Sequence, residues 1–356
     1  MLFLHSLAHL LVDALCAATV FGRLGGAADL TGLILLYNTL AFSTQCLVGL
    51  AADRIGKHVP AASASMALVV LGYALPVPAA VRVVLIGTGN SVFHVAAGTV
   101  TLAESGGKAG KLGVFVAPGA IGVTLGTLFS SLGWVFAVLL ALAALAEIPL
   151  AHFLTAASAE RPRTGVGKPA PAHTDGRFSL SAVLLLTAAV AVRAVGGSVV
   201  RFPWKTGAAA ALILTAAVWL GKTAGGFLCD RLGADRRGAK RAAWISVPAA
   251  AALITFCSAW MIPSLAGQFF INLTMPVTLW LLYRAMPDAP GFAFGLAASA
   301  LWPGTIAGKL ITLTGPAAAL LTLASFFFGL FAILYAANRI LPKSENDPTS
   351  ERSPIK

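Results

Sequence analysis

The feature that most constrains this chain is a series of about twelve apolar runs, each long enough to cross a bilayer as a helix. Such a crossing needs about 20 mostly apolar residues. Only 11% of the 356 residues are charged and 58% are hydrophobic, whereas about a quarter of a soluble domain is charged. We therefore expect an all-α, multi-pass protein whose partner is the lipid bilayer. The runs lie near residues 2–22, 30–51, 59–78, 82–103, 112–132, 134–156, 179–199, 207–229, 241–261, 264–284, 291–313 and 317–338.

The polar connections divide these runs into two sets of six. The longest connection, residues 157–178, carries basic residues with Pro and Gly between them, which is typical of a linker. We expect an N-terminal six-helix bundle over 1–156, a cytoplasmic linker over 157–178 and a C-terminal six-helix bundle over 179–340. The polar tail, 341–356, is expected to be disordered.

A short motif, Gly-x-x-x-Asp-Arg-x-Gly, occurs once in each set, and the second copy begins 177 positions after the first. Each copy joins two apolar runs, so we expect a tight turn in which the aspartate meets helix N–H groups or a neighbouring arginine. Two copies at matching places indicate two halves built on one plan. The motif residues are Gly49, Asp53, Arg54 and Gly56 in the first copy and Gly226, Asp230, Arg231 and Gly233 in the second.

This pair resembles the loop between the second and third helices of the major facilitator superfamily and its counterpart in the second half. The resemblance implies twelve transmembrane helices in two pseudo-symmetric six-helix bundles. It also implies that the two loops take part in the conformational switch. The second copy departs from the pattern after Gly233, where Ala234 and Asp235 replace the basic Lys57 and His58 of the first copy.

The distribution of basic residues predicts the orientation. If the N-terminus is cytoplasmic, the loops and tail on that side hold 18 of the 25 Lys and Arg residues, and the outer loops hold four. This bias predicts that both termini face the cytoplasm, and we expect the membrane to be the inner membrane of a bacterium. It also accounts for the net charge of +12 without a nucleic-acid partner.

Polar residues inside apolar runs are candidates for function, because burying them in a bilayer costs free energy. His5, His9 and Asp13 recur every four residues in the first run, so they share one face of a helix. The pattern leaves three interpretations open. The stripe is hydrogen-bonded and structural, or it handles protons and faces substrate, or it binds a divalent cation.

A second polar group is expected near the bilayer midplane. Asn90 and His94 lie four residues apart in the fourth run, and Gln268 and Asn272 lie 178 positions later in the tenth, which is almost the same repeat offset. Substrate binds between the halves in folds of paired repeats, so these side chains are candidates for a central cavity. Interhelical hydrogen bonding is the competing interpretation.

A narrower resemblance rests on His9-x3-Asp13 together with Gly87-x-Gly-x3-Phe-His94. The combination is similar to the fosmidomycin-resistance branch of the major facilitator superfamily, although that branch usually has proline where this chain has Val95. The resemblance implies a secondary transporter, often an efflux carrier that exchanges substrate for protons. It does not transfer a particular drug substrate.

Two further features resemble the same superfamily. Arg82 is similar to its helix 4 arginine. The segment Gly113-x4-Pro118-Gly-x2-Gly122 resembles its antiporter signature, with Ala117 in place of a glycine. A Pro-Gly pair in a membrane helix also serves simply to bend it.

The charges deep in the second half are all cationic: Arg193, Lys222 and Lys309. Lys222 precedes the second motif, so we expect it to reach the membrane surface with its ammonium group. Arg193 is too deep to do so. It is expected to pair with Asp13 or to anchor an anionic substrate, because a guanidinium suits carboxylate and phosphate groups.

These observations predict a secondary active transporter, with proton coupling at Asp13, His9 and His94. The predicted contacts to a small organic anion are His5, Asn90, Arg193, Gln268 and Asn272. Efflux follows from the resemblance, and uptake of a metabolite or a non-transporting role as sensor or scaffold are the alternatives. No cofactor or bound metal is expected, and the sequence has no arrangement typical of an enzyme. We expect a monomer.

Overall fold

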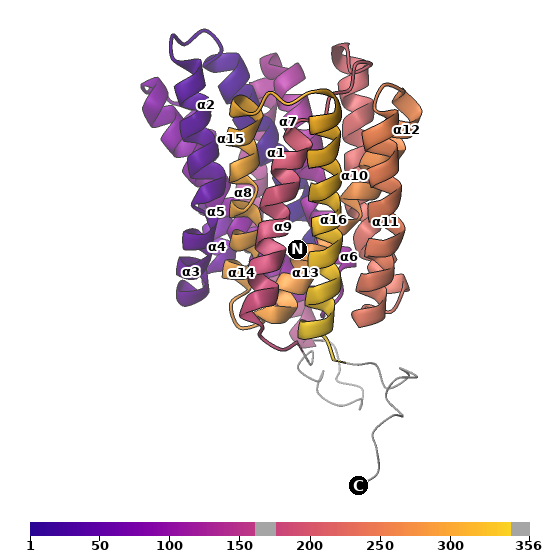
Figure 1. The fold of residues 1–356 in the computed structure, drawn as a ribbon. Helices are drawn as coiled ribbons and strands as arrows, with labels where there is room; N and C mark the ends of the chain where they lie inside the picture. Colours follow the sequence, from indigo (N-terminus) through magenta and orange to yellow (C-terminus); the bar gives the residue numbers. More distant parts are fainter. Residues whose placement is uncertain (161–175, 343–356) are drawn as a thin grey trace.

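The computed structural model describes residues 1–160 and 176–342, except for the side chains of 157–160, Thr305, Gly308 and Lys309. Every regular element in this part is a helix (Figure 1). The first half contains α1 (Leu2–Ala18), α2 (Leu30–Asn38), α3 (Gln45–Ile55), α4 (His58–Ala74), α5 (Ala79–Glu104), α6 (Gly110–Val116), α7 (Pro118–Leu128) and α8 (Gly133–Glu160). The second contains α9 (Leu180–Ser198), α10 (Gly207–Arg231), α11 (Arg236–Cys257), α12 (Met261–Asn272), α13 (Thr274–Ala285), α14 (Pro290–Ser299), α15 (Trp302–Leu310) and α16 (Gly315–Ile340).

Nine continuous helical stretches within the described residues are long and apolar enough to cross a membrane. Several join two elements, as when α2 continues through a π-helical turn (Thr39–Ser43) into α3. The other three expected runs are helical but differ: α4 has 17 residues, α11 begins with several cations, and α14 and α15 are interrupted. The expectation of an all-helical, multi-span chain is therefore confirmed, while the structure supports nine long spans where twelve were predicted.

Successive spans alternate in direction, so α3, α6, α13 and α14 lie at the end from which residues 160 and 342 leave the bundle (Figure 1). We call this the linker end and the other the far end. Within each half the helices pack on one another, for example α4 on α5 and α9 on α16. Across the halves, α3 packs on α14 and α6 packs on α10. Residues 161–175 of the expected linker and 343–356 of the expected tail lie outside the described residues.

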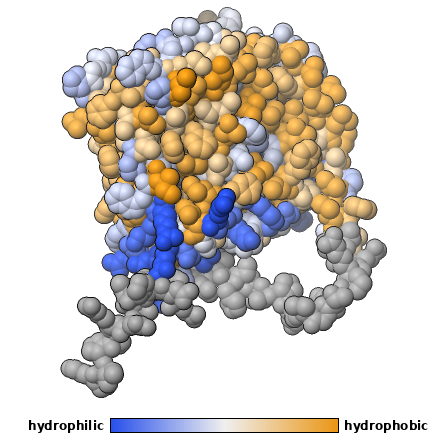
Figure 2. All heavy atoms as spheres, turned by 90° about the vertical axis from the view of Figure 1, so that its right-hand side faces the viewer, coloured by the Kyte–Doolittle hydropathy of each residue, from blue (hydrophilic) through white to orange (hydrophobic). Residues whose placement is uncertain are grey.

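The surface matches a membrane protein. On the face shown in Figure 2, apolar side chains form a broad band across the bundle, and hydrophilic side chains gather next to the linker end. Exposed cations there include Arg54, Lys57, Lys108 and Lys111. An apolar belt of this kind is what lipid tails require.

One helix break positions the site. The fifth span is interrupted at Ala117, between α6 and α7. Pro118 has no N–H, so it cannot donate a hydrogen bond to the preceding turn of helix. The last turn of α6 therefore has carbonyl groups available to side chains from other helices.

Candidate functional site

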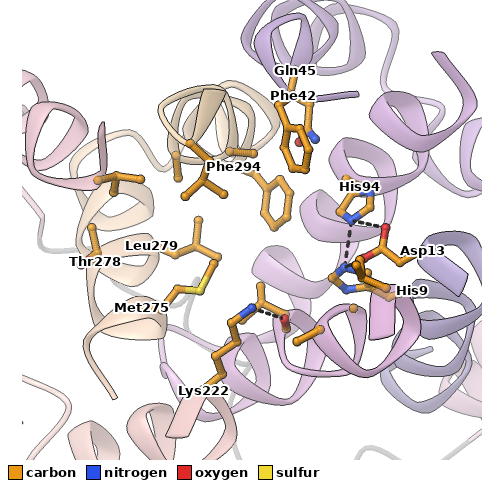
Figure 3. Close-up of a pocket in the computed structure, with 18 of the residues that line it drawn as sticks. His9, Asp13, Phe42, Gln45, His94, Lys222, Met275, Thr278, Leu279 and Phe294 are labelled. Carbon is orange, nitrogen blue, oxygen red and sulfur yellow. Dashed lines mark hydrogen bonds and ion pairs between the residues drawn. The ribbon is translucent and has the colours of Figure 1, made fainter. Parts of the chain in front are cut away.

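A cavity of about 280 Å³ lies between the two halves (Figure 3). The first half contributes side chains from α1, α3, α5, α6 and α7, and the second from α9, α10, α13 and α14. Its charged and titratable residues are His9, Asp13, His94, Arg193 and Lys222. The cavity therefore brings together two groups of charges that are far apart in the sequence.

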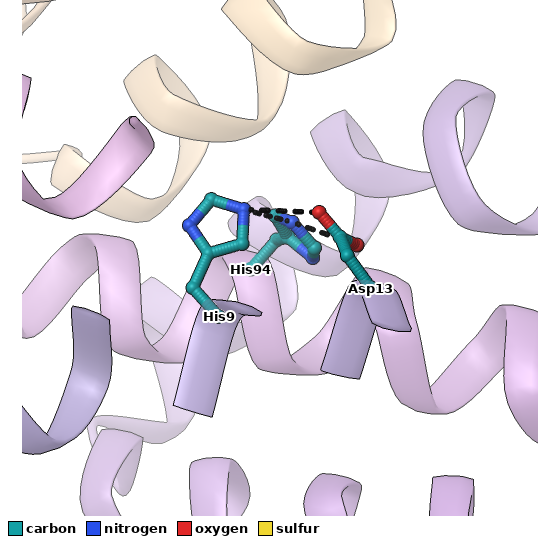
Figure 4. A group of neighbouring side chains, drawn as sticks. All are labelled: His9, Asp13 and His94. Carbon is teal, nitrogen blue, oxygen red and sulfur yellow. Dashed lines mark hydrogen bonds and ion pairs between the residues drawn. The ribbon is translucent and has the colours of Figure 1, made fainter. Parts of the chain in front are cut away.

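Figure 4 shows the first group, which consists of His9, Asp13 and His94. The Nε2 atoms of His9 and His94 are 2.8 Å apart. The Asp13 carboxylate lies 3.4 Å from Nε2 of His9 and 3.7 Å from Nε2 of His94. The structure thus joins the three residues predicted to couple protons, two from α1 and one from α5.

The hydrogen bonds of the two imidazole rings determine where their protons lie. Nδ1 of His9 is 2.7 Å from the carbonyl oxygen of Phe115, and Nδ1 of His94 is 2.8 Å from that of Asn90. A carbonyl oxygen can only accept, so each Nδ1 carries a hydrogen and donates it. In two neutral rings the Nε2 lone pairs would then face each other beside a carboxylate. One additional proton between them relieves this repulsion, so the arrangement suits the binding of a proton.

The same three residues provide ligand atoms of the kinds that bind divalent cations, all within 4.8 Å of one another. Two nitrogen ligands of tetrahedral zinc lie about 3.3 Å apart, as follows from Zn–N bonds of about 2.0–2.1 Å. The 2.8 Å between the imidazole nitrogens is instead the length of a hydrogen bond. The geometry therefore favours a shared proton.

Asn90 lies behind this cluster and is almost fully buried. Its side-chain amide donates to Oδ1 of Asp13 at 2.9 Å. Asn90 is not among the residues that line the cavity, so in this structure its side chain orients the carboxylate.

The break before Pro118 contributes to both charge groups. The carbonyl of Phe115, in the last turn of α6, accepts from His9 at 2.7 Å. The next carbonyl, that of Val116, is 3.5 Å from the ammonium nitrogen of Lys222. The C-terminal end of a helix carries partial negative charge, so this turn is a suitable partner for both donors.

The second group consists of Arg193 from α9 and Lys222 from α10. Nη1 of Arg193 donates to Oγ1 of Thr274 at 3.0 Å. Neither cation has a carboxylate within 4.0 Å among the side chains that the structure describes. The expected pairing of Arg193 with Asp13 is thus not formed. The expectation that Lys222 reaches the membrane surface is wrong, because its side chain lines the cavity and its ammonium group lies beside the end of α6.

A smaller cavity of about 20 Å³ lies on the other side of Arg193, within the second half. Thr274, Thr278 and Ser325 are among its polar lining residues. A space of this size with several polar partners is sufficient for one water molecule. Arg193 lines both cavities, and its guanidinium, which donates to Thr274 of the smaller one, can also contact this water.

The remaining predicted contacts do not line the main cavity. His5 is fully buried and its Nε2 lies 2.7 Å from Oε1 of Glu147, which is also fully buried. Asn272 donates to the backbone carbonyl of Gln268 in its own helix at 2.8 Å. A role for these three residues in substrate binding stays a prediction. Lys309 lies in α15, and its side chain is outside the described residues.

Arg82 also lies away from the cavity. It is almost fully buried and donates to the carbonyl oxygens of Gly72, Tyr73 and Leu75 at 2.7–2.8 Å. These are the last carbonyls of α4 and the residue that follows it. Arg82 therefore satisfies a helix end that would otherwise be unpaired.

The two motif aspartates bind across the halves. Asp53 accepts from the N–H groups of Gly291 and Phe292, at 2.7 and 2.8 Å, at the start of α14. Asp230 accepts from the N–H groups of Ala109 and Gly110, both at 2.8 Å, at the start of α6. The sequence predicted contacts with helix N–H groups, but it did not predict that these would belong to the opposite half.

Two of the motif glycines lie at the same contacts between the halves, where α3 meets α14 and α10 meets α6. Gly49 lies against the backbone of Gly291, and Gly226 lies against the backbone of Ala109, where a Cβ atom would collide in each case. Gly56 and Gly233 lie in the turns that follow α3 and α10, with φ of 68° and 131°. Arg54 and Arg231 are exposed at the linker end. Tight turns were expected at both places and are observed.

The apolar walls of the cavity were not predicted. Phe42 and Phe294 face the cavity from opposite halves, together with Met275 and Leu279 (Figure 3). Each belongs to a run in which most residues are apolar, so hydrophobicity does not distinguish them. Among the cavity residues that the sequence analysis missed, only Lys222 could have been identified from the sequence, because it is a cation in the middle of a span.

Comparisons with known proteins identify the fold. No family model and no curated protein matches the chain. Among solved structures, a variant of the Escherichia coli fucose:proton symporter FucP has a TM-score of 0.62 at 15% identity, over 94% of this chain and 97% of that one. FucP in the outward conformation has a TM-score of 0.62 at 14% identity, with the same coverage. The human organic anion transporter MFSD10 has a TM-score of 0.60 at 15% identity, over 93% and 97%.

These identities are low, so the likeness is one of fold. The neighbours are membrane transporters and not enzymes, and FucP is a transporter of the major facilitator superfamily. The chain therefore has the fold of the major facilitator superfamily transporters.

Proposed function

We propose that this chain is a secondary active transporter that moves a small organic anion by alternating access and couples this movement to protons. The observation that carries the proposal is the cavity, which has His9, Asp13 and His94 on one wall and Arg193 and Lys222 on the other. FucP is a proton symporter and MFSD10 is an organic anion transporter. The fold and the charges are consistent with both properties in one protein.

The proton-binding step occurs at the first wall. A proton shared between His9 and His94 beside Asp13 neutralises the negative charge of the cluster. Loss of this proton restores the negative charge of the cluster, in a cavity where Arg193 and Lys222 bind the anion. The protonation state thereby biases which conformation is stable, since each state of charge has its own preferred solvation and partners.

Alternating access requires the two halves to move relative to each other. We take residues 1–156 and 179–340 as the moving bundles, with twelve crossings in total. Asp53 and Asp230 join the two halves at the linker end, so we assign the structure to a state that is closed at the linker end and open at the far end. The basic linker end is placed in the cytoplasm of a bacterium, with the protein a monomer in the inner membrane.

Efflux in exchange for protons rests on the resemblance to the fosmidomycin-resistance branch. The charges favour a second candidate, uptake of the anion together with a proton. A proton at His9 and His94 makes the cavity more positive, so it strengthens binding of the anion, and the anion strengthens binding of the proton equally. Because each ligand strengthens binding of the other, this coupling suits transport of the proton and the anion in the same direction.

Transport of labelled organic acids into proteoliposomes tests the proposal. We expect accumulation that depends on the imposed pH gradient, disappears with a protonophore and exceeds that in protein-free vesicles. Accumulation driven by an acidic exterior indicates symport, and accumulation driven by an acidic lumen indicates exchange. Protein-dependent accumulation that does not change with the imposed pH gradient would contradict proton coupling.

A further inference from the structure

We propose that the substrate is a compact amphiphilic organic acid, with its acidic oxygens at one end, held by Arg193 and Lys222, and a hydrocarbon body at the other. This inference rests on the proposed transport function and specifies its substrate class. It also assigns Lys222 to substrate binding.

The cations define the acidic end. Arg193 and Lys222 come from adjacent spans of the second half and both line the cavity, and neither has a carboxylate partner among the described residues. The bond from Lys222 to the carbonyl of Val116 is long, at 3.5 Å. A carboxylate is a stronger partner for an ammonium group than a neutral carbonyl. Binding of an acid therefore replaces a weak contact with a strong one.

The walls define the hydrocarbon body. Figure 3 shows Met275 and Leu279 on the same side of the cavity as Lys222, with Phe294 and Phe42 next to each other above the ammonium group. Burial of hydrocarbon against such side chains is favourable in proportion to its area. A cavity of about 280 Å³ lies at the small end of the range for ligand sites, roughly 300–1,000 Å³, so the ligand is compact.

The uncharged polar groups of the lining exclude a sugar. The side-chain amide nitrogen of Gln45 already donates to the carbonyl of Ala41 at 2.6 Å, and the hydroxyl of Thr278 donates to that of Thr274 at 2.9 Å. Of the polar atoms of Gln45 and Thr278, only Oε1 of Gln45 is buried without a partner, so most hydroxyls of a sugar would lose water without gaining an uncharged partner, which is costly. Although FucP is a fucose symporter, this chain is expected to reject such a ligand.

The rest of the cavity lining disfavours an acid with carboxylates at both ends. A second carboxylate would lie against Phe42 and Phe294, or beside Asp13, which is also an acid. An unpaired buried charge is strongly unfavourable. The acidic oxygens must therefore be confined to the end at Arg193 and Lys222.

Calorimetric titration of the purified full chain tests the inference without a membrane gradient. The probes are butanoate, pentanoate and hexanoate, with hexanamide, hexanedioate and fucose for comparison. We expect the dissociation constant to fall about fourfold per added methylene, from a transfer free energy of about 0.8 kcal/mol per buried methylene. Hexanamide, hexanedioate and fucose should each bind at least about tenfold more weakly than hexanoate. Hexanamide and fucose have no carboxylate for Arg193 and Lys222, and hexanedioate leaves its second carboxylate buried without a partner; each effect is worth about a factor of ten or more.

Variants identify the binding groups. Lys222→Met and Arg193→Met should each weaken hexanoate binding about tenfold or more, the usual effect of losing a hydrogen bond to a charged group. Lys240→Met is the matched control, because Lys240 is a linker-end cation that contacts Asn338. It should leave the affinity unchanged.

The outcomes separate this inference from the proposed transport. Binding of hexanoate through Lys222 without any transport would support the substrate class and contradict the function. Proton-coupled transport of a hydrophilic anion with no preference for chain length would support the function and contradict the substrate class. Absence of binding by all three acids at millimolar concentration, or equal binding of hexanedioate or fucose, would overturn the inference.

Discussion

Removal of the two aspartates that join the halves should open the linker end. Asp53 and Asp230 each accept two N–H groups at the start of a helix in the opposite half, at 2.7–2.8 Å. In Asp53→Asn and Asp230→Asn the shape is kept, but the charge is lost and an amide group faces one N–H donor. Loss of the anion at a helix N-terminus, together with an N–H group left without an acceptor, costs about 0.5–2 kcal/mol at each site.

These bonds exist only while the halves are in contact at this end, so their loss acts on the conformational equilibrium. The contacts made by Asp53 and Asp230 are separate, so their free-energy costs should add to about 1–4 kcal/mol in the double variant. At about 1.4 kcal/mol for each factor of ten, this shifts the equilibrium between about fivefold and several hundredfold towards a linker end that is open.

The assay is the distance between spin labels at Lys57→Cys and Arg241→Cys, measured by double electron–electron resonance after replacement of the native cysteines. Both positions are exposed at the linker end, one in each half. We expect a longer distance to gain population in each single variant and to dominate in the double variant.

The matched control is Asp235→Asn. Asp235 accepts from the N–H of Gly238 at 2.7 Å, at the start of α11 in its own half. Its loss should weaken that helix end without changing the distance between the labels. If the double variant kept the wild-type distance distribution, the assignment of Asp53 and Asp230 to the switch would be refuted.

Three further predictions concern residues outside the cavity. Glu147→Ala should lower stability to chemical denaturation by about 3–5 kcal/mol, because it leaves His5 buried without its partner; a loss below about 1 kcal/mol would contradict the importance of this pair. Asn90→Ala should reduce substrate-driven proton movement while leaving binding of the acid intact, since Asn90 orients Asp13, and unchanged proton movement would refute that role. Gly226→Leu should prevent closure of the linker end, because the added side chain collides with the start of α6; retention of the wild-type label distance would contradict this.

The sequence predicted the helical architecture well, because apolar length alone identifies a membrane span. It also predicted the turns at Gly56 and Gly233 and drew attention to His9, Asp13 and His94, since polar residues stand out in apolar runs. It could not predict which groups they would meet. The contact of His9 with Phe115 depends on a helix break 106 residues away, and only the packed structure brings the two together.

The rotation of each span was the main quantity that the sequence left undetermined. Gln268 and Asn272 have the same spacing as Asn90 and His94, yet of these four residues only His94 lines the cavity, because packing sets the face that a membrane helix presents. His5 was grouped with His9 and Asp13 by its spacing, but its partner is Glu147 on α8. The cross-half partners of Asp53 and Asp230 were equally hidden, since no local pattern encodes a contact between halves.

Substrate-dependent proton movement tests the central claim most directly. The protein is reconstituted into vesicles that contain a pH-sensitive dye, and organic acids are added to wild type, Asp13→Asn and His9→Gln, with Asp29→Asn as a surface control. Asp29 caps α2 through the N–H of Gly32, so its loss should leave transport intact. The account predicts proton movement above that of protein-free vesicles for wild type and Asp29→Asn, and none for the other two. Wild-type proton movement in Asp13→Asn and His9→Gln would contradict proton coupling at this cluster.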